Sequence, residues 1–314
     1  ASEVAVQARL AHNPQLKFAE LDRRVELGFA ANDPYLGSQW HLSKINASAA
    51  WDVARGQGVT IAILDTGVAA SHPDLAANVV PGWNFYGNNA DTSDPHGHGT
   101  AVAGAAAAVF NNGMGVASVA GAARIMPVRI ADANAYAYWS TVAQGLTWAA
   151  DNGARVANIS YVGVAGSASV QSAAQYMKSK GGLVIVCAGN NGIDEGITPN
   201  TTMIPVSATN SSDAKTSWSS YGNFVVVAAP GQDIWTTTRT LGYQAWSGTS
   251  LASPVVAGVV ASMMAAKPTL SAAQVESLLL STAVDLGAAG RDARCASGRG
   301  DADGARAAAP RAGA

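Results

Sequence analysis

Short apolar runs alternate along this chain with segments whose apolar residues recur at helical spacing. Six apolar runs predict buried strands, near residues 59–64, 125–130, 155–159, 183–187, 204–208 and 224–229. Runs that are apolar on both faces and separated by helical patterns are typical of parallel strands covered by helices on both sides. The pattern therefore predicts an α/β fold with a mainly parallel central sheet.

Helical patterns fill the intervals between these runs. Segments 141–150 and 167–180 predict surface helices, and two glycines follow the second segment at the usual stop position. The Ala/Val/Met-rich stretch after Ser250 has few polar positions, so we expect its helix to lie at the centre of the fold. A last helix is expected to open at Ser271, with Glu276 nearby.

Composition indicates one sizeable globular domain. The chain has 314 residues, of which 48% are hydrophobic and 13% charged, and its net charge is −2. Without a basic excess we expect no nucleic-acid partner. No run approaches the roughly 18 apolar residues that a transmembrane helix needs, and no basic-then-apolar leader opens the chain, so we expect no membrane association. We also expect a monomer.

A serine stands where a glycine-bearing turn meets the central apolar stretch. The segment 248–254 is GTSLASP, with Ser250 at the predicted helix start. A nucleophilic serine must be exposed, held at one angle and set beside a base, since its hydroxyl alone is too weak to attack an amide. Gly248 allows a tight turn, and the free N–H groups of a helix start can face a developing oxyanion. Taken alone, such a motif is more often a helix N-cap formed by Thr249 or Ser250.

An acid and a base stand in two further segments. Asp65 follows the apolar run 59–64, and an acid at the carboxyl end of a strand in an α/β protein faces the ligand crevice. His98 opens a small-residue stretch, 98–104, that can pack as a helix against a sheet. Of the five histidines, His98 is the best candidate for the base, with His96 in the preceding loop as the second.

Together these segments resemble a known family. DTG at 65–67, HGTAVAG at 98–104 and GTSLASP at 248–254 follow one another in the order Asp, His, Ser. In this the chain resembles the subtilisin-like serine proteases (subtilases, peptidase S8 family), and within them the thermitase branch. The resemblance covers about residues 32–285. It implies a subtilisin-like three-layer α/β/α sandwich and a serine endopeptidase that forms an acyl-enzyme intermediate.

The resemblance also implies a role for each catalytic residue. Ser250 would attack the scissile carbonyl, His98 would take its proton and return it to the leaving amine, and Asp65 would orient the imidazole. The family's side-chain oxyanion donor matches Asn190, which follows the apolar run 183–187. Without the family, Asn190 is simply a turn residue.

Two backbone edges flank an extended substrate peptide in this family, a form of strand addition. The matching segments are 133–137 and 158–163, and both depart from the family pattern. Val162 replaces a glycine that lines the primary pocket, while Tyr136 and Tyr138 replace small or polar residues. We hypothesise a narrowed pocket for small or medium apolar side chains. The predicted substrate-binding residues are Ala135, Tyr136, Ala137, Ser160, Tyr161, Val162 and Gly163.

The segment 110–116 (FNNGMGV) resembles a calcium loop of the family. Calcium takes six to eight oxygen ligands, and a glycine-bearing loop can turn its carbonyl groups inward. Without the family, such a loop is more often only a turn. Asp91 and Asp94 are candidates for a second site, although they do not align with the thermitase pattern. The implied Ca²⁺ ligands are the side chains of Asp33, Asp74 and Asn112 and the carbonyls of Phe110, Met114 and Val116.

Three segments are expected along the chain. Residues 1–31 form an N-terminal extension that resembles a propeptide remnant, the alternative being an ordinary extension packed on the surface. The peptidase domain spans 32–285, and 286–314 is an Ala/Gly/Arg-rich flexible tail. Cys187 falls on a predicted strand and Cys295 in this tail, so we expect no disulfide. The family implies a secreted zymogen whose partners are protein or peptide substrates and its own propeptide.

Three function classes remain open on the sequence. The first is an endopeptidase. The second uses the same triad on another polymer, such as an aliphatic polyester, because the chemistry of acyl transfer is common to esters and amides. The third is a non-catalytic peptide-binding relative, which usually lacks a triad member, whereas Asp65, His98 and Ser250 are all present here.

Overall fold

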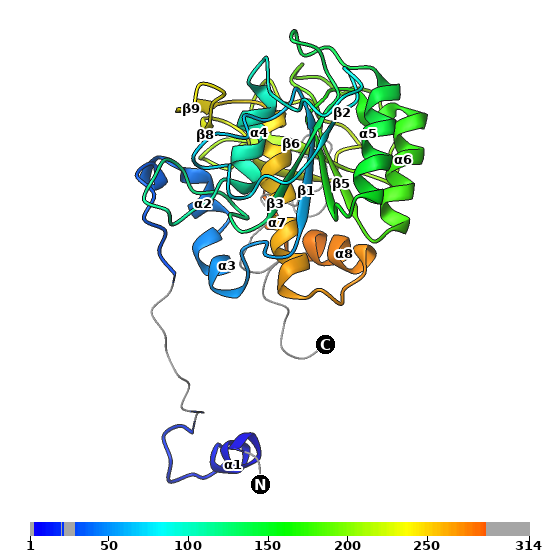
Figure 1. Ribbon diagram of the computed structural model, residues 1–314. Helices are drawn as coiled ribbons and strands as arrows, with labels where there is room; N and C mark the ends of the chain where they lie inside the picture. The colour runs from blue at the N-terminus through cyan, green and yellow to red at the C-terminus, as the bar shows by residue number, and fades with distance from the viewer. Residues whose placement is uncertain (1–2, 20, 22–28, 287–314) are drawn as a thin grey trace.

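A computed structural model describes residues 3–19, 21 and 29–286, and its centre is a parallel sheet (Figure 1). Seven strands pair in the order β2-β3-β1-β4-β5-β6-β7, and every pairing is parallel. All six predicted strands are present, within a few residues. The strands are β1 Thr60–Asp65, β2 Trp83–Asn84, β3 Arg124–Arg129, β4 Val156–Ile159, β5 Leu183–Cys187, β6 Ile204–Thr209 and β7 Val227–Pro230.

Helices cover both faces of this sheet (Figure 1). α4 and α7 pack on one face, whereas α5 and α6 pack side by side on the other. The expected three-layer α/β/α sandwich is therefore confirmed. The helices are α1 Glu3–Leu10, α2 Trp40–Lys44, α3 Ala47–Val53, α4 His98–Ala107, α5 Trp139–Asp151, α6 Ala168–Ser179, α7 Thr249–Ala266 and α8 Ala272–Thr282, with 3₁₀ turns η1 Leu36–Ser38 and η2 Val164–Gly166.

The side chains of β1 divide between the two cores. Ile61 and Ile63 join the cluster under α4 and α7, while Ala62 and Leu64 join the cluster under α5 and α6. Successive residues of a strand point to opposite faces, so a strand between two helical layers is apolar at most of its positions. This is why the continuous apolar runs predicted the strands correctly.

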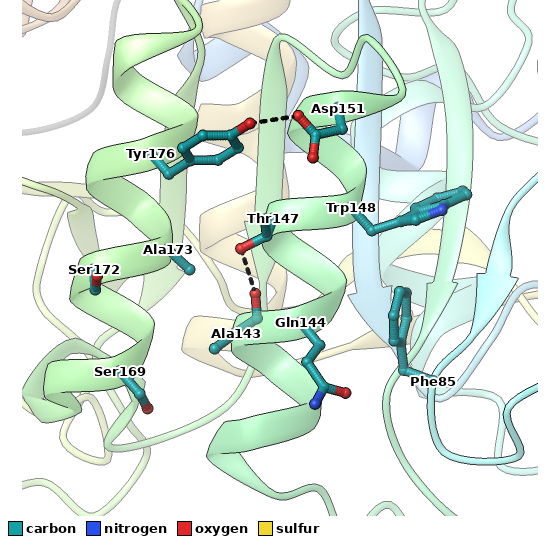
Figure 2. Close-up of a pocket in the computed structure, with 10 residues that line it drawn as sticks. All are labelled: Phe85, Ala143, Gln144, Thr147, Trp148, Asp151, Ser169, Ser172, Ala173 and Tyr176. Atoms are coloured by element: carbon teal, nitrogen blue, oxygen red, sulfur yellow. Dashed lines mark hydrogen bonds between the residues drawn. The ribbon is translucent and has the colours of Figure 1, made fainter.

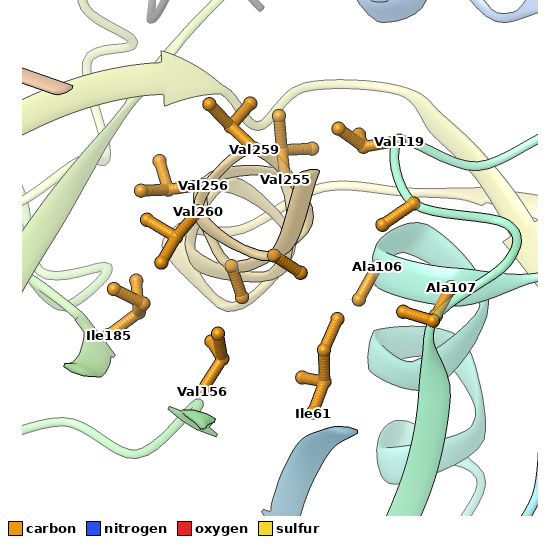
Figure 3. Packing of buried hydrophobic residues seen from close by; sticks show 14 of the residues in the cluster. Ile61, Ala106, Ala107, Val119, Val156, Ile185, Val255, Val256, Val259 and Val260 are labelled. Carbon is orange, nitrogen blue, oxygen red and sulfur yellow. The ribbon is translucent and has the colours of Figure 1, made fainter. Parts of the chain in front are cut away.

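α7 runs through the centre of one core. Figure 3 shows α7 end-on, with Ile61, Val156 and Ile185 of the strands on one side of it and Val255 and Val259 on the other. A side chain at Gly258 of α7 would come within 3.0 Å of the Ala106 carbonyl oxygen on α4, so the glycine permits close helix packing. The predicted central position of this helix is confirmed.

One expectation about apolar runs was wrong. Among the described residues, Thr249–Ala266 is long and apolar enough to cross a membrane by length and composition, with a mean hydropathy of 1.6. However, 89% of this window is buried inside the fold. A core helix covered on all sides is as apolar as a membrane span, which explains the composition.

Other elements were not predicted from the pattern. β8 (Ile234–Thr237) and β9 (Tyr243–Trp246) form a separate antiparallel pair, and β9 is mostly half-exposed. The cap of α8 also differs from expectation, because Ser271 bonds reciprocally with Gln274. Glu276 instead forms an ion pair of 2.6 Å with Lys178 of α6.

The described part of the N-terminal segment contacts the domain at Phe29. Its ring lies 5.9 Å from that of Trp51 and 5.3 Å from that of Phe110, and the Arg55 guanidinium lies 3.9 Å from its centre. The domain boundary near residue 32 stays a prediction. The predicted tail, with Cys295, lies outside the described residues apart from its first residue.

Candidate active site

The carboxyl ends of β1, β4 and β5 bring three candidate residues to one edge of the sheet. β1 pairs with β4, and β4 with β5. Asp65 is the last residue of β1, Ser160 directly follows β4, and Asn190 lies three residues beyond β5. Because neighbouring parallel strands end at the same edge, these residues lie together at the edge where α/β proteins bind their ligands.

Asp65 and His98 form a hydrogen-bonded pair at this edge. The His98 Nδ1 atom lies 2.7 Å from Asp65 Oδ1. His98 begins α4 directly after Gly97, whose φ of 110° favours glycine. A side chain at Gly99 would overlap the Gly67 carbonyl oxygen. The glycines therefore allow α4 to bring its first residue against the end of β1.

The surroundings of His98 favour its protonated form. Burial lowers the pKa of His98, but the charge and hydrogen bond of Asp65, together with the charge of Asp94, raise that pKa above its ordinary value of 6.5. Asp65 is fully buried, and its Oδ2 atom has no hydrogen-bond partner within the described chain. An imidazolium that forms at His98 is thus stabilised by an adjacent buried carboxylate.

Ser250 lies in the first turn of α7, at the same edge of the sheet, where it contacts Ser160. Gly248 precedes the helix, and Ser250 itself is 8% exposed. The Trp246 ring, just before this turn, stands edge-on to the His98 ring with 6.4 Å between the centres. The Ser250 Oγ donates to the Ser160 carbonyl oxygen at 3.4 Å. A bond this long is weak, so the hydroxyl can rotate toward the imidazole when a substrate is bound.

The Asn190 amide faces the nucleophile. Its Oδ1 atom accepts hydrogen bonds from the backbone N–H and the side-chain hydroxyl of Thr249, both at 2.9 Å. A Cβ placed on Gly248 would lie 3.5 Å from Asn190 Nδ2 and 3.6 Å from the Ser250 backbone nitrogen. Two N–H donors therefore border one small space beside Ser250. This arrangement is suited to a developing oxyanion.

A small hairpin follows β3 at the same edge of the sheet. Ala137 forms an antiparallel bridge with Ala131, and Ala135 has a φ of 64° in the turn between them. Ala137 packs into the core, whereas Tyr136 and Tyr138 are 72% and 70% exposed. Since the two tyrosines alternate with a half-buried alanine that packs against the core, both rings project into solvent.

The segment after β4 runs past the nucleophile. Ser160 Oγ donates to the Ser250 carbonyl oxygen at 3.0 Å. The Tyr161 hydroxyl is buried and has no partner among the described residues, and burial, with nearby carboxylates, raises its pKa. Val162 is 46% exposed, and Gly163 follows with a φ of 78°. This segment and the hairpin are the two predicted edges, and both are at the catalytic end of the sheet.

Comparison with known proteins identifies the chain. The profile of the Subtilase family (Peptidase S8) matches residues 56–298. The chain belongs to the subtilase family. It is 46% identical to thermitase of Thermoactinomyces vulgaris over 237 residues, which are 74% of this chain and 84% of thermitase. It is also 40% identical to a thermophilic serine proteinase of Bacillus sp. (strain AK1), over 82% of this chain and 65% of that protein.

Solved structures agree with this subtilase assignment. A protease of Pseudoalteromonas arctica superposes with a TM-score of 0.78 at 30% identity, over 89% of this chain and 99% of that chain. A cold-adapted subtilisin-like serine proteinase superposes with a TM-score of 0.69 at 32% identity. The predicted family and enzyme class are therefore confirmed: this chain is a serine endopeptidase of the subtilase family.

Two buried carboxylates meet beside the segment 110–116 of this subtilase. Asp33 Oδ2 accepts the Asn111 N–H at 2.8 Å, but Asp33 Oδ1 is buried without a partner among the described residues. Asp74 accepts the Asn112 amide at 2.8 Å and the Val116 N–H at 3.0 Å. Burial raises the pKa of Asp33, and the charge of Asp74 adds to this against the opposing backbone hydrogen bonds.

Asp94 has a role that differs from the considered second calcium site. One carboxylate oxygen accepts Thr66 Oγ1 at 2.8 Å and the Gly97 and His96 N–H groups at 2.7 and 3.0 Å. The other accepts the backbone N–H and hydroxyl of Thr100 at 2.9 and 2.6 Å. Five donors leave little capacity for a metal ion. An acid just ahead of a helix start is a capping signal, so this role of Asp94 could have been predicted from the sequence.

A shallow groove between α5 and α6 lies away from this site (Figure 2). Aromatic rings of Phe85, Trp148 and Tyr176 line it, and the Tyr176 hydroxyl donates to Asp151 at 2.6 Å. Both helices cover the face of the sheet opposite α4 and α7. The groove therefore contains none of the candidate catalytic residues.

Proposed function

We propose that this subtilase hydrolyses peptide bonds with Ser250 as nucleophile, His98 as base and acid, and Asp65 as the orienting carboxylate. Asn190 and the Ser250 N–H serve as oxyanion donors. The observation that carries the proposal is the 2.7 Å contact between His98 Nδ1 and Asp65 Oδ1, in the cleft that also contains Ser250. That contact leaves His98 Nε2 as the nitrogen that exchanges protons with the substrate side.

Acylation follows from these positions. Ser250 Oγ attacks the scissile carbonyl carbon while its proton passes to His98 Nε2, and the resulting imidazolium is stabilised by Asp65. The carbonyl oxygen becomes an oxyanion between Asn190 Nδ2 and the Ser250 N–H. The C–N bond then breaks, and His98 returns the proton to the leaving amine, which leaves an ester on Ser250.

Deacylation repeats the sequence with water. His98 Nε2 takes a proton from a water molecule, whose oxygen attacks the ester carbonyl. The same two donors stabilise the second oxyanion. When the ester C–O bond breaks, His98 gives the proton back to Ser250 Oγ, and the carboxylic acid product is released.

The deciding experiment is hydrolysis of casein and of succinylated peptide substrates by wild type and Ser250→Ala. Ser281→Ala is the matched control, because Ser281 is exposed on α8 and its hydroxyl donates to the Leu278 carbonyl of the same helix. We expect Ser250→Ala to remove activity and Ser281→Ala to retain it. Hydrolysis that survives Ser250→Ala would overturn the nucleophile, and a folded wild type that cleaves polyester but no peptide would overturn the substrate class.

The proposal includes contacts of an extended peptide with the two cleft edges. Ala135, Tyr136 and Ala137 would contact it from one side, and residues 160–163 from the other. The support is their position at the ends of β3 and β4, beside Ser250. Exposed tyrosine rings suit contact with substrate side chains, since they combine apolar area with a hydroxyl group.

The proposal also includes a structural calcium ion. The side chains of Asp33, Asp74 and Asn112 and the carbonyls of Phe110, Met114 and Val116 would hold it. These residues fit the ion, because Asp33 Oδ1 is buried without a partner in the described chain, and burial, with a smaller contribution from the charge of Asp74, raises the pKa of Asp33. When bound, calcium neutralises these charges and stabilises the loop, and it takes no part in peptide hydrolysis.

Secretion and activation from a zymogen complete the proposal. The support is similarity to proteins such as the extracellular protease of Xanthomonas campestris, with 36% identity over 88% of this chain and 56% of that protein. The N-terminal residues 1–31 would be what remains of a propeptide. Intact-mass analysis of wild type and Ser250→Ala checks this, because self-cleavage near residue 30 should occur only in the wild type.

A further inference from the structure

Two segments border Ser250 where the substrate side chain next to the attacked carbonyl would lie. The segment 160–163 borders Ser250 on one side, and Gly189 and Asn190 border it on the other. These two segments follow β4 and β5, which are hydrogen-bonded neighbours. With the carbonyl oxygen between the oxyanion donors, the side chain has to enter between these two segments.

Three side chains converge on Gly189, in the second of these segments. A Cβ placed on Gly189 would lie 2.9 Å from Glu195 Oε1, 2.9 Å from Ser220 Oγ and 3.2 Å from Val162 Cγ1. Val162 belongs to the first wall, whereas Glu195 reaches in from the loop that follows β5. Glu195 Oε1 and a methyl group of Val162 therefore approach the same point beside Gly189, the residue before Asn190.

Glu195 is held in this position by neutral partners. Its Oε1 atom accepts the Ser220 hydroxyl at 2.6 Å and the Asn191 amide at 3.0 Å. Backbone hydrogen bonds of 2.8 and 3.0 Å tie the same loop to the segment 218–221. The half-buried carboxylate is thus fixed before any substrate arrives, so little conformational entropy is lost when it binds a ligand.

The charge of Glu195 is not compensated within the described chain. No lysine, arginine or histidine nitrogen of the described residues lies within 4.0 Å of its carboxylate. Its Oε2 atom accepts no hydrogen bond from these residues and is not enclosed. A half-buried carboxylate with a free oxygen gains from a cation that can reach it.

We propose that Glu195 is a specificity residue that favours lysine or arginine on the acyl side of the scissile bond. This inference rests on the peptidase function proposed above. The aliphatic stem of such a side chain packs against Val162, while its charged end reaches Glu195. The result differs from the apolar preference that the sequence predicted, because Glu195 lies on a loop whose fold brings it to the pocket.

The test uses succinylated tetrapeptide p-nitroanilides that differ only at the residue before the cleaved bond. Lysine is compared with methionine, a neutral side chain of similar shape, and glutamate with glutamine. The enzymes are wild type, Glu195→Gln, which keeps the hydrogen-bonding oxygen without the charge, and Asp194→Asn. Asp194 is the matched control, since this acid is exposed on the same loop and lies against Gly222.

We expect kcat/KM of the wild type for lysine to exceed that for methionine by about 10- to 100-fold, the range that a hydrogen bond between charged groups supplies. Glu195→Gln should bring this ratio to within about threefold of unity, and Asp194→Asn should leave it unchanged. A wild-type ratio at or below one, or a ratio that Glu195→Gln does not alter, would overturn the inference.

If the Glu195→Gln protein does not fold, a second measurement on the wild type tests the same inference. Butylammonium and butanol are then compared as inhibitors of wild-type cleavage of the methionine substrate. Stronger competitive inhibition by butylammonium supports the role of Glu195, and equal inhibition contradicts it. A failure of the peptidase function itself is distinguishable, because no substrate in the series would then be cleaved.

Discussion

Thr249 donates two hydrogen bonds to a single atom of Asn190 and so decides which way the Asn190 amide points. Its backbone nitrogen and its Oγ1 both lie 2.9 Å from Asn190 Oδ1. With Oδ1 occupied on that side, Nδ2 faces the space beside the Ser250 backbone nitrogen. Thr249 therefore orients the amide that we propose as an oxyanion donor.

Asn190→Ala should lower kcat by about 10²–10³, with KM little changed. The magnitude is that of losing one oxyanion donor in a subtilisin, which is a member of the same family. KM changes little because the donor acts mainly on the transition state. Steady-state kinetics on a succinylated peptide measures both constants. Asn152→Ala, at the C-terminal end of α5, is the control, and an unchanged kcat for Asn190→Ala would contradict the role.

The pH dependence should follow the raised pKa of His98. Only neutral His98 can accept the serine proton, so kcat/KM should rise with pH through a midpoint above 6.5. Asp65→Asn removes the largest raising influence and leaves burial, so the midpoint should move down and kcat should fall by about 10⁴. A pH–rate profile of both proteins measures this. A midpoint that stays in place in Asp65→Asn would contradict the assigned cause.

Asp94→Asn should weaken the positioning of the His98 imidazole and lower its pKa, while the imidazole itself stays in place. The carboxylate of Asp94 accepts donors on both sides of His98, from Gly97 and Thr100, and its charge also raises the pKa of His98. We expect kcat/KM to fall about 10-fold and the acidic limb of the pH profile to move down. Asp91→Asn in the same loop is the control, because its carboxylate is exposed. If Asp94 had only a structural role, Asp94→Asn would lower stability and leave the acidic limb of the pH profile unchanged.

Asp33→Asn should change stability in opposite directions with and without calcium. The pKa of Asp33 is raised in the folded protein, so without metal its ionised form is destabilising and stability should increase as pH falls through that pKa. The Asp33→Asn substitution removes this charge, so the variant should have a higher Tm than the wild type in a chelator at neutral pH. In calcium the same substitution loses a ligand and should lower Tm.

Thermal unfolding of wild type and Asp33→Asn in calcium and in a chelator measures this. Calcium at 10²–10³ times its Kd stabilises by about 3–4 kcal/mol, which for a domain of this size is about 5–15 °C in Tm. Asp151→Asn on α5 is a control that should keep the full calcium response. A wild-type Tm that is the same in calcium and in chelator would contradict the proposed site.

The sequence predicted six of the seven strands of the central sheet because their signal is local, whereas the two-residue strand β2 was not predicted. A strand between two helical layers is apolar at most of its positions, and the segment 183–187 shows this pattern without reference to any partner strand. β9 could not be found in this way, since it is half-exposed and is defined by its pairing with β8. The alternation along β9 is too weak to predict a strand.

The sequence by itself determined the family and six of the seven strands of the sheet, and it supplied Asp65, His98, Ser250 and Asn190 as candidate site residues, because short motifs carry their own glycine turns and helix starts. Only the tertiary structure decided how Asp94 joins Thr66 to Thr100 and how Glu195 reaches Gly189 beside Val162. These contacts join separate segments at the carboxyl ends of neighbouring strands. Local periodicity cannot predict them, because strand order and loop packing determine which segments meet there.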